Sequence, residues 1–279
     1  MLLYIRNLFL KALLVIFFAA LCISSTPSTA KAIDFAVTTP WLSEIASFIV
    51  GDKSRVRCLS NWNINGEVLI IGAPKADEVV IALNSKEASH FRLNKNNDLY
   101  VLYESLIIQD HQVRSLFYDP AVIPLIAQNV MKIIANKDSK NYVYYQRRLA
   151  ELQARIESAN DVGKHLLKNK KIMDLTASQG VWVRSVAEDT IRPPEEVWDK
   201  WLAGDTKSLK AALDEAKRRN WTVMVDSWTS TVIKSLVLDF DNSVLLPAPT
   251  KGESYFTHLN NIYLSIWNKT KGISDPIKK

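Results

Sequence analysis

Short apolar segments alternate with amphipathic helical segments along the chain after its first 32 residues. Residues 33–39 have the alternating pattern of a strand, and residues 40–50 carry apolar side chains at helical spacing. Thr39 is a suitable N-cap, and Pro40 suits the first helical position. Residues 55–62 read as the next strand. A strand, a helix and a strand in this order predict a parallel sheet with a right-handed crossover.

The rest of the first half continues the α/β pattern. Residues 66–72 and 78–84 are predicted as short strands, and residues 99–108 are a further candidate. From Asp119 to Ile134 the apolar residues fall on one stripe, which predicts a surface helix.

A long helix is predicted over most of Ser139–Lys168. This stretch lacks proline and keeps apolar residues three or four positions apart, with Gly163 as its single glycine. A helix of that length spans about 45 Å. It could be an ordinary long core helix, half of a coiled coil, or a rigid spine that joins two lobes.

A second α/β series follows the long helix. Strands are predicted at residues 171–176, 221–228 and 243–249, and helices at residues 193–205, 206–220, 229–240 and 253–271; residues 182–189 fit a helix end or a strand. The predicted fold class is therefore α/β, with two Rossmann-like lobes joined by one long spine helix. The general rule for open α/β sheets puts the binding cleft between the lobes, at the carboxyl ends of the strands.

These patterns also predict the domain boundaries. The first lobe takes residues 33–138, the linking spine helix residues 139–169, and the second lobe residues 170–279. In front of them, residues 1–32 combine a short basic start, an apolar run and a small-residue end at Ala30-Lys31-Ala32. That is the pattern of a cleavable signal peptide, cut after Ala32, and it predicts a periplasmic protein.

Two other interpretations of the N-terminal segment are weaker. The apolar run from Ala12 to Ile23 is shorter than the roughly 20 residues that a spanning helix needs. A lipid attached at Cys22 would require a smaller residue than Leu21 in front of it.

Charge and cysteine content exclude some classes of function. Residues 1–32 contain three basic residues and no acidic ones, so their removal lowers the formal net charge from +6 to +3. The remaining charges are spread along the chain and form no basic stripe, which argues against nucleic-acid binding. Only Cys58 remains after cleavage, so no intramolecular disulfide is expected and stability must come from burial.

Catalytic signatures are missing from the sequence. It contains no G-x-S-x-G motif, no Gly-rich phosphate loop and no Ser-His-Asp set that can be placed on neighbouring strand ends. Cys58 falls on a predicted core strand, which favours an inert thiol. We therefore expect that the protein is not an enzyme.

Several segments together resemble a known family. FAVTTPWLSEIASFIVGD, the FYDP turn with its helix, KNYVYYQRRLAELQARIE and SYFTHLNNIYLSI are similar, in order and spacing, to the zinc and manganese substrate-binding proteins of ABC importers. The resemblance covers most of the chain after residue 32 and is weakest between Asn61 and Gln109. It implies two lobes, a cleft that holds one divalent ion, and an ABC permease of the inner membrane as the partner.

The resemblance also implies metal ligands that this chain lacks. The family's histidine before the W-L-D-P turn corresponds to Ser115, the histidine that opens the second lobe to Thr176, and the late aspartate to Leu246. The first-lobe histidine has no counterpart in residues 62–72. Zinc and manganese sites need several imidazole or carboxylate donors. The sequence therefore predicts a degenerate metal site, and zinc or manganese is suggested by the resemblance alone; no cofactor is expected.

Few residues remain as substitute metal ligands. His111 with Asp110 could supply a displaced pair, and Asp226 could be either a ligand contact or a cap for the following helix. His90 is expected in a solvated loop, His165 near the end of the spine helix and His258 at the surface. None of these four histidines has a metal-ligand spacing.

The predicted cleft suits an organic solute better than a bare ion. Trp62, Trp182 and Trp228 fall near predicted strand ends, and each could be core or a ligand platform. The predicted cleft residues are Ser115, Phe117, Thr176, Ser178, Gln179, Asp226 and Trp228. We expect a monomeric periplasmic solute-binding protein of an ABC importer that binds a small non-metal or complexed-metal solute. The alternative is an exported accessory protein of the same fold that no longer transports a ligand.

Overall fold

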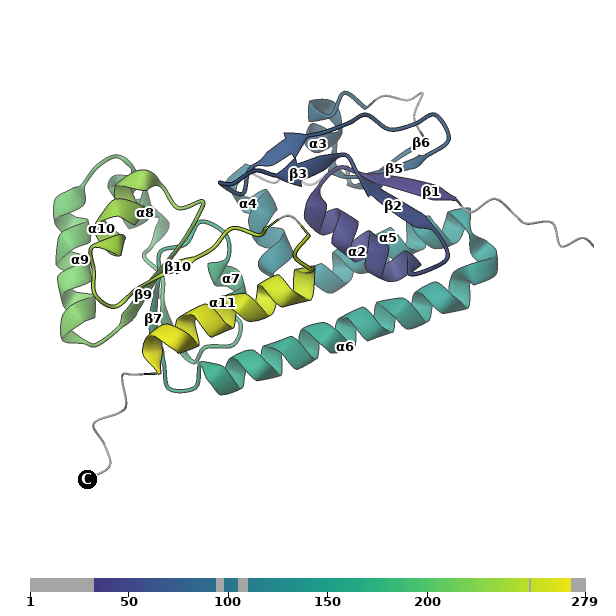
Figure 1. The fold of residues 1–279 in the computed structure, drawn as a ribbon. Helices are drawn as coiled ribbons and strands as arrows, with labels where there is room; N and C mark the ends of the chain where they lie inside the picture. Colours follow the sequence, from purple (N-terminus) through teal and green to yellow (C-terminus); the bar gives the residue numbers. More distant parts are fainter. Residues whose placement is uncertain (1–32, 94–97, 105–109, 251, 272–279) are drawn as a thin grey trace, which may run out of the picture. The chain divides into compact units, whose positions relative to one another are not determined.

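The structure is a computed structural model that describes residues 33–93, 98–104, 110–250 and 252–271. All of these belong to one compact unit, Ile33–Lys279. Two four-stranded parallel sheets lie in the two halves of this unit, and one long helix extends along both (Figure 1). The predicted fold class is confirmed, including the two lobes and the long helix.

The first lobe contains the sheet β2-β1-β5-β6, in that spatial order. Its strands are β1 (Asp34–Val37), β2 (Arg55–Cys58), β5 (Val79–Asn84) and β6 (Asp98–Tyr103). Every residue of β5 is buried, as expected for a central strand that is covered on both faces. Its helices are α2 (Pro40–Val50), α3 (Ser85–His90), α4 (Asp110–Ser115) and α5 (Ile123–Lys137), with a 3₁₀ turn η1 (Leu116–Tyr118) between α4 and α5.

A small antiparallel hairpin projects from this lobe. It consists of β3 (Ser60–Trp62) and β4 (Val68–Ile70), with Asn61 opposite Leu69. The predicted strand 55–62 is therefore divided, because the chain turns at Leu59 from the parallel sheet into the hairpin. The hairpin turn lies at Gly66, whose positive φ of 72° favours glycine.

The second lobe contains the sheet β10-β9-β7-β8. Its strands are β7 (Lys171–Asp174), β8 (Asp189–Ile191), β9 (Thr222–Asp226) and β10 (Ser243–Leu246). Its helices are α7 (Gly180–Arg184), α8 (Glu195–Leu202), α9 (Thr206–Arg218), α10 (Thr231–Leu238) and α11 (Tyr255–Thr270). The ambiguous segment 182–189 is the end of α7 followed by a turn into β8.

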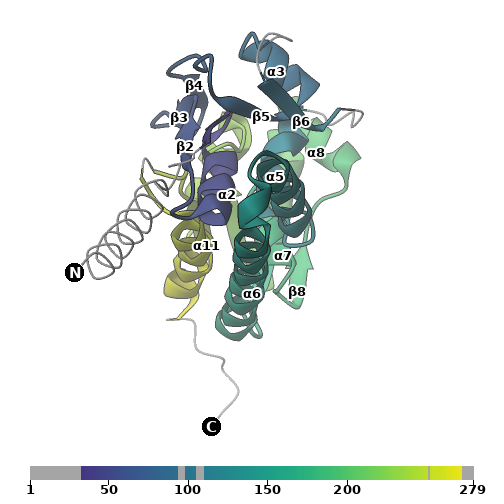
Figure 2. The ribbon, with the colours of Figure 1, turned by 90° about the vertical axis from the view of Figure 1, so that its right-hand side faces the viewer.

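The long helix α6 (Tyr142–Leu166) follows a 3₁₀ turn, η2 (Ser139–Asn141). Its buried side chains include Tyr145, Leu152 and Ile156, and they join a core cluster that contains residues of both lobes. Helix α11 runs beside α6, as both views show (Figure 1 and Figure 2). Tyr263 of α11 lies so close to Gly163 that a Cβ atom at Gly163 would be 2.4 Å from its ring. The spine is therefore packed into the core and is not a solvent-exposed linker.

No helix within the described residues is both long and apolar enough to cross a membrane. The predicted signal peptide, residues 1–32, lies outside the described part of the chain.

Candidate functional site

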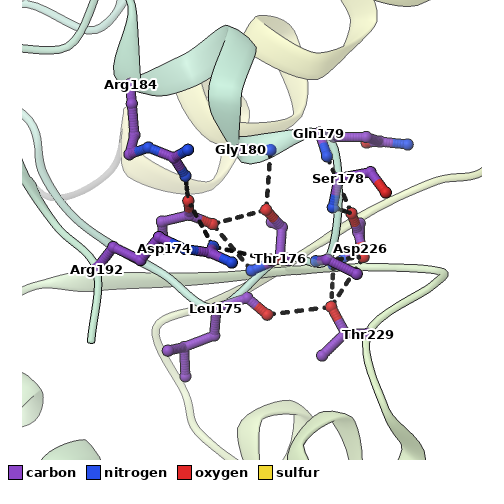
Figure 3. Close-up of polar contacts among 11 residues, drawn as sticks. Asp174, Leu175, Thr176, Ser178, Gln179, Gly180, Arg184, Arg192, Asp226 and Thr229 are labelled. Carbon is purple, nitrogen blue, oxygen red and sulfur yellow. Dashed lines mark hydrogen bonds and ion pairs between the residues drawn. The ribbon is translucent and has the colours of Figure 1, made fainter. Parts of the chain in front are cut away.

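The loop after β7 folds around the carboxylate of Asp226, which ends β9 (Figure 3). Asp226 is fully buried. Its Oδ2 accepts hydrogen bonds from the backbone N–H groups of Ser178 (2.8 Å) and Gln179 (3.0 Å), and its Oδ1 accepts from the N–H of Ala177 (3.1 Å) and the hydroxyl of Thr229 (2.8 Å). The carboxylate therefore holds the loop that precedes α7, a structural role that the sequence did not suggest.

A second buried carboxylate, Asp174 at the end of β7, organises the same loop. Its Oδ1 accepts from the backbone N–H (2.9 Å) and the hydroxyl (2.7 Å) of Thr176. Its Oδ2 pairs with the guanidinium groups of Arg184 and Arg192, the latter at 3.0 Å (Figure 3). Burial lowers the pKa of Arg184 to about 10, which leaves it protonated at neutral pH. Two cations thus share one buried anion beside the loop.

A polar pocket of about 290 Å³ opens over this cluster. It is lined by Ser115, Thr176, Ala177, Ser178, Val181, Arg184, Arg192, Pro193, Glu195 and Trp198. Ser115 comes from the first half of the chain and the other residues from the second, so residues of both lobes line this pocket. Hydroxyl and guanidinium groups make it suitable for hydrogen bonding to oxygen atoms of a solute.

An aromatic pocket of about 300 Å³ lies on the other side of the segment that ends α4. It is lined by Thr39, Trp41, Trp62, Val68, Asn84, Lys86, Glu87, His90, Phe91, Val113, Arg114, Phe117, Tyr118 and Trp228. The second lobe contributes Trp228 to this pocket. The indole Nε1 of Trp228 donates a hydrogen bond to the carbonyl of Gly66 (2.8 Å) in the hairpin turn. The neighbours Arg114 and Ser115 thus line different pockets.

The structure places five of the seven predicted cleft residues at these two pockets. Ser115, Thr176 and Ser178 line the polar pocket. Phe117 and Trp228 line the aromatic pocket.

The other two predicted cleft residues are fully buried, Gln179 within the loop and Asp226 beneath it. The Gln179 side chain donates to the carbonyl of Pro247 (2.8 Å). A direct contact between a solute and either side chain stays a prediction, and it requires the loop to open.

The positions that the resemblance assigned to metal ligands offer few free donors. Thr176 uses its hydroxyl to donate to Asp174 and to accept from the N–H of Gly180 (2.8 Å). Leu246 is a fully buried hydrocarbon at the end of β10. Asp226, which was considered as a substitute ligand, already accepts four hydrogen bonds. Within the described residues, no group of three or more His, Cys, Asp or Glu side chains could hold a metal ion. Zinc and manganese sites usually take several imidazole or carboxylate donors, and the described residues bring no such group together here.

His258 was expected at the surface, and that prediction is wrong. Only 1% of the residue is exposed, because α11 turns this face toward α2 and η1. Its Nε2 lies 3.2 Å from the hydroxyl of Tyr118 and its Nδ1 lies 3.3 Å from Oε2 of Glu253. Burial lowers the pKa of His258, against the opposing effect of Glu253. His258 is therefore part of a buried polar chain.

Of the other histidines, His90 lines the aromatic pocket. His90 is exposed at the end of α3, where a loop was expected, and His165 is exposed near the end of α6, as expected. The side chain of His111 lies outside the described part of the molecule.

The three candidate tryptophans have different roles. Trp182 is fully buried and stacks on Tyr263, with ring centroids 5.5 Å apart. Trp62 and Trp228 are half-buried and lie 6.3 Å apart at the aromatic pocket. The core interpretation therefore holds for Trp182, and the pocket interpretation fits the other two.

Sequence reasoning missed the charged cluster and part of the aromatic wall. Asp174 follows three predicted strand residues and was read as part of the strand, although a carboxylate at a strand end is a typical cleft position. Arg184 and Arg192 are eight residues apart and converge only through the turn between α7 and β8. Trp41 and Tyr118 were assigned to helix packing and to a turn, and no sequence signal shows that they meet.

Two α/β lobes, an intervening cleft and a long connecting helix define the fold of periplasmic metal-binding substrate-binding proteins. No protein-family model matches the sequence, and no curated protein matches it either. Solved structures of this class do match the fold. ZnuA is 19% identical with a TM-score of 0.63, and the match covers 85% of this chain and 99% of ZnuA.

Two further structures support the same comparison. FpvC from Pseudomonas aeruginosa, a substrate-binding protein in complex with Mn²⁺, is 12% identical with a TM-score of 0.59 and coverage of 88% and 100%. The laminin-binding protein Lmb of Streptococcus agalactiae, described as an adhesin with metal-transporting activity, is 12% identical with a TM-score of 0.57 and coverage of 85% and 99%. At these low identities the matches establish the fold and nothing finer.

Proposed function

We propose that the protein is a periplasmic solute-binding protein of an ABC importer whose metal site is degenerate. It is exported through residues 1–32, acts as a monomer and delivers a small non-metal or complexed-metal solute to an inner-membrane permease. Its lobes comprise residues 33–138 and 170–279, linked by residues 139–169, which contain the helix α6 (Tyr142–Leu166). Ser115, Phe117, Thr176, Ser178, Gln179, Asp226 and Trp228 are its proposed cleft residues.

The observation that carries the proposal is a pair of ligand-sized pockets on the fold of substrate-binding proteins. Both pockets take residues from both lobes, which is the usual position of the solute in two-lobe binding proteins. Together they offer an aromatic wall and a group of hydroxyl and guanidinium donors. No catalytic constellation was recognised in the sequence, so binding is the better-supported activity.

A bare divalent ion fits the same site poorly. High affinity for zinc requires several charged or imidazole donors with their supporting hydrogen bonds in place. At the mapped positions the chain offers neutral Ser115, a Thr176 hydroxyl that is already hydrogen-bonded, and Leu246. We therefore expect no tight binding of zinc or manganese.

Calorimetric titration of chelator-treated protein with zinc tests this expectation, with ZnuA as the positive control. We predict a dissociation constant no tighter than about 1 μM, corresponding to roughly −8 kcal/mol. Submicromolar zinc binding would show that the ligand mapping is wrong, and the Asp110–His111 pair would be the first to substitute.

A thermal-shift screen over metals and small polar or aromatic solutes tests the binding function itself. A solute present at 100 times its dissociation constant should stabilise the folded protein by about 2.7 kcal/mol. Stabilisation by at least one solute supports the proposal. A complete lack of response would favour an exported accessory protein of the same fold.

A further inference from the structure

The aromatic pocket is built to receive a flat, apolar group. The ring centroids of Trp41 and Trp62 lie 5.8 Å apart, and those of Trp62 and Trp228 lie 6.3 Å apart. Tyr118 completes the group, with its ring centroid 6.3 Å from that of Trp228 and 6.5 Å from that of Trp41. These side chains come from α2, β3, η1 and the loop after β9, so four separate segments converge on one wall. Aromatic rings pack well against other rings in offset or edge-on geometry.

The size of the pocket limits the ligand to a small molecule. Its volume of about 300 Å³ is at the lower end of the range typical for ligand sites. One or two fused rings fit such a space.

The charged groups at this pocket favour an anion. Arg114 and Lys86 both line it, and the Arg114 guanidinium lies 5.5 Å from the ring centroid of Trp228. Among the described residues that line the pocket, Glu87 is the only carboxylate, and burial raises its pKa. A ligand with an ammonium group would be repelled by the positive charge of Arg114 at the face of Trp228. An incoming carboxylate would meet a guanidinium donor beside the aromatic wall.

We propose that the aromatic pocket binds a small aromatic carboxylate, with its ring against Trp62 and Trp228 and its carboxylate at Arg114. This inference rests on the proposed function and names the class of solute for the same cleft. Arg114 acts as the anion anchor, and Lys86 adds positive charge at the pocket.

Calorimetric titration with two matched probes tests the sign of the charge. The probes are 2-naphthoate and 2-naphthylmethylammonium, which share the same ring system and differ in charge. We expect saturable binding of 2-naphthoate at one site, at least tenfold tighter than binding of the ammonium probe. Equal or tighter binding of the ammonium probe overturns the inference, yet it leaves the protein a solute-binding protein.

Substitution of the proposed anchor tests its location. Arg114→Gln should weaken 2-naphthoate binding at least tenfold, and Arg114→Lys should retain most of it. Arg147→Gln, at an exposed position on α6, is the matched control and should bind as the parent does. Circular dichroism of each variant verifies folding. Unchanged binding by a folded Arg114→Gln variant contradicts the inference.

A variant of the wall separates aromatic stacking from charge. Trp62→Leu should also lose at least tenfold in 2-naphthoate affinity, because Leu removes the ring but keeps an apolar surface. If 2-naphthoate fails to bind while the thermal-shift screen finds another solute, the inference fails and the proposed function stands. If no solute of any class binds, both fail.

Discussion

At the scale of single residues, two buried carboxylates shape the candidate site. Asp174 and Asp226 end neighbouring parallel strands, so their side chains reach the same edge of the sheet. Each is satisfied by the loop of residues 175–179. Buried carboxylates are stable only when hydrogen-bonded or paired, which explains why this loop is held so firmly.

Asp174→Asn should lower the free energy of unfolding by about 3 kcal/mol. The substitution keeps the shape of the side chain but leaves two guanidinium groups facing a neutral amide, and a broken buried ion pair is costly. We use the low end of the usual range because Arg184 and Arg192 are about one-third exposed. Urea denaturation measures the change.

Asp161→Asn is the control for this prediction. Asp161 pairs with Lys164 on the exposed surface of α6, so its loss should change stability by less than about 0.5 kcal/mol. If Asp174→Asn is as mild as this control, the cluster around Asp174 is not a stabilising feature.

The buried His258 predicts a specific dependence of stability on pH. Its pKa is lowered in the folded protein, so below about pH 6.5 the unfolded chain takes up a proton that the folded chain excludes. Stability should therefore fall as the pH drops from 7 toward 5, by at most about 1.4 kcal/mol per pH unit from this group. The pKa of neighbouring Glu253 is also lowered, and its contribution is lost only below about pH 4.5.

Urea denaturation at pH 7.5, 6.5 and 5.5 checks this prediction, with His258→Gln beside the parent. The variant should show a flatter profile over this range. The raised pKa values of Glu44 and Glu87 make stability rise as the pH falls, which opposes the effect of His258. The contribution of His258 is therefore the difference in slope between the parent and the variant. Identical slopes would show that His258 is not excluded from protonation in the folded state.

At the scale of secondary-structure elements, the sequence predicted most of the fold. Hydrophobic periodicity located the helices α2, α5, α6, α9 and α11 and the central strands, because each has one clear apolar face or run. It failed where the chain changes direction without a proline or glycine, as at Leu59 between β2 and β3. Hydrophobic periodicity predicts which face of a helix or strand is buried. It does not predict which other element packs against that face.

Helix α6 offers a test of close packing between elements. Gly163→Ala would normally stabilise a helix by about 1 kcal/mol. Here the added Cβ would lie 2.4 Å from the ring of Tyr263, which is fully buried and stacked on Trp182. Overpacking typically costs about 1–3 kcal/mol, so we expect net destabilisation of roughly 1 kcal/mol.

Thermal denaturation of Gly163→Ala measures the balance. The same substitution is then made in a Tyr263→Leu background. There Gly163→Ala should destabilise the protein less than it does in the parent, because the smaller side chain leaves room for the methyl group. Stabilisation by the single variant would show that α6 and α11 can move apart at no cost.

At the scale of the whole described molecule, the candidate site depends on contacts that no local sequence pattern reveals. Ser115 and Thr176 were linked only through a resemblance, and both line the polar pocket in the structure. Trp62, Phe117 and Trp228 were suggested as pocket residues by the sequence, but the complete aromatic wall was not, since its rings lie up to 187 positions apart, from Trp41 to Trp228. Residues at this distance meet only after both lobes and α6 have packed into a common core.

The contact between the hairpin turn and Trp228 should control how the two lobes meet. A Cβ atom at Gly66 would lie 2.8 Å from the Trp228 ring and 2.7 Å from the Cβ of Ala248, and the positive φ of Gly66 adds backbone strain. Gly66→Ala should therefore separate the hairpin from the second lobe and weaken the hydrogen bond from Trp228 to the Gly66 carbonyl. We expect a loss of about 1–3 kcal/mol in stability, or a rearranged contact at smaller cost.

Tryptophan fluorescence and thermal denaturation of Gly66→Ala distinguish these two outcomes. Either a lower melting temperature or a red-shifted emission, from greater exposure of Trp228 and Trp62, supports the contact as a device that holds the lobes together. Gly204→Ala is the control, because Gly204 also has a positive φ, of 101°, but no atom lies within 4 Å of its added Cβ. Backbone strain alone would affect both variants similarly, so an effect confined to Gly66→Ala isolates the steric contact with Trp228. Equal effects in the two variants would show that backbone conformation causes the change. The contact between the hairpin and Trp228 would then not hold the lobes together.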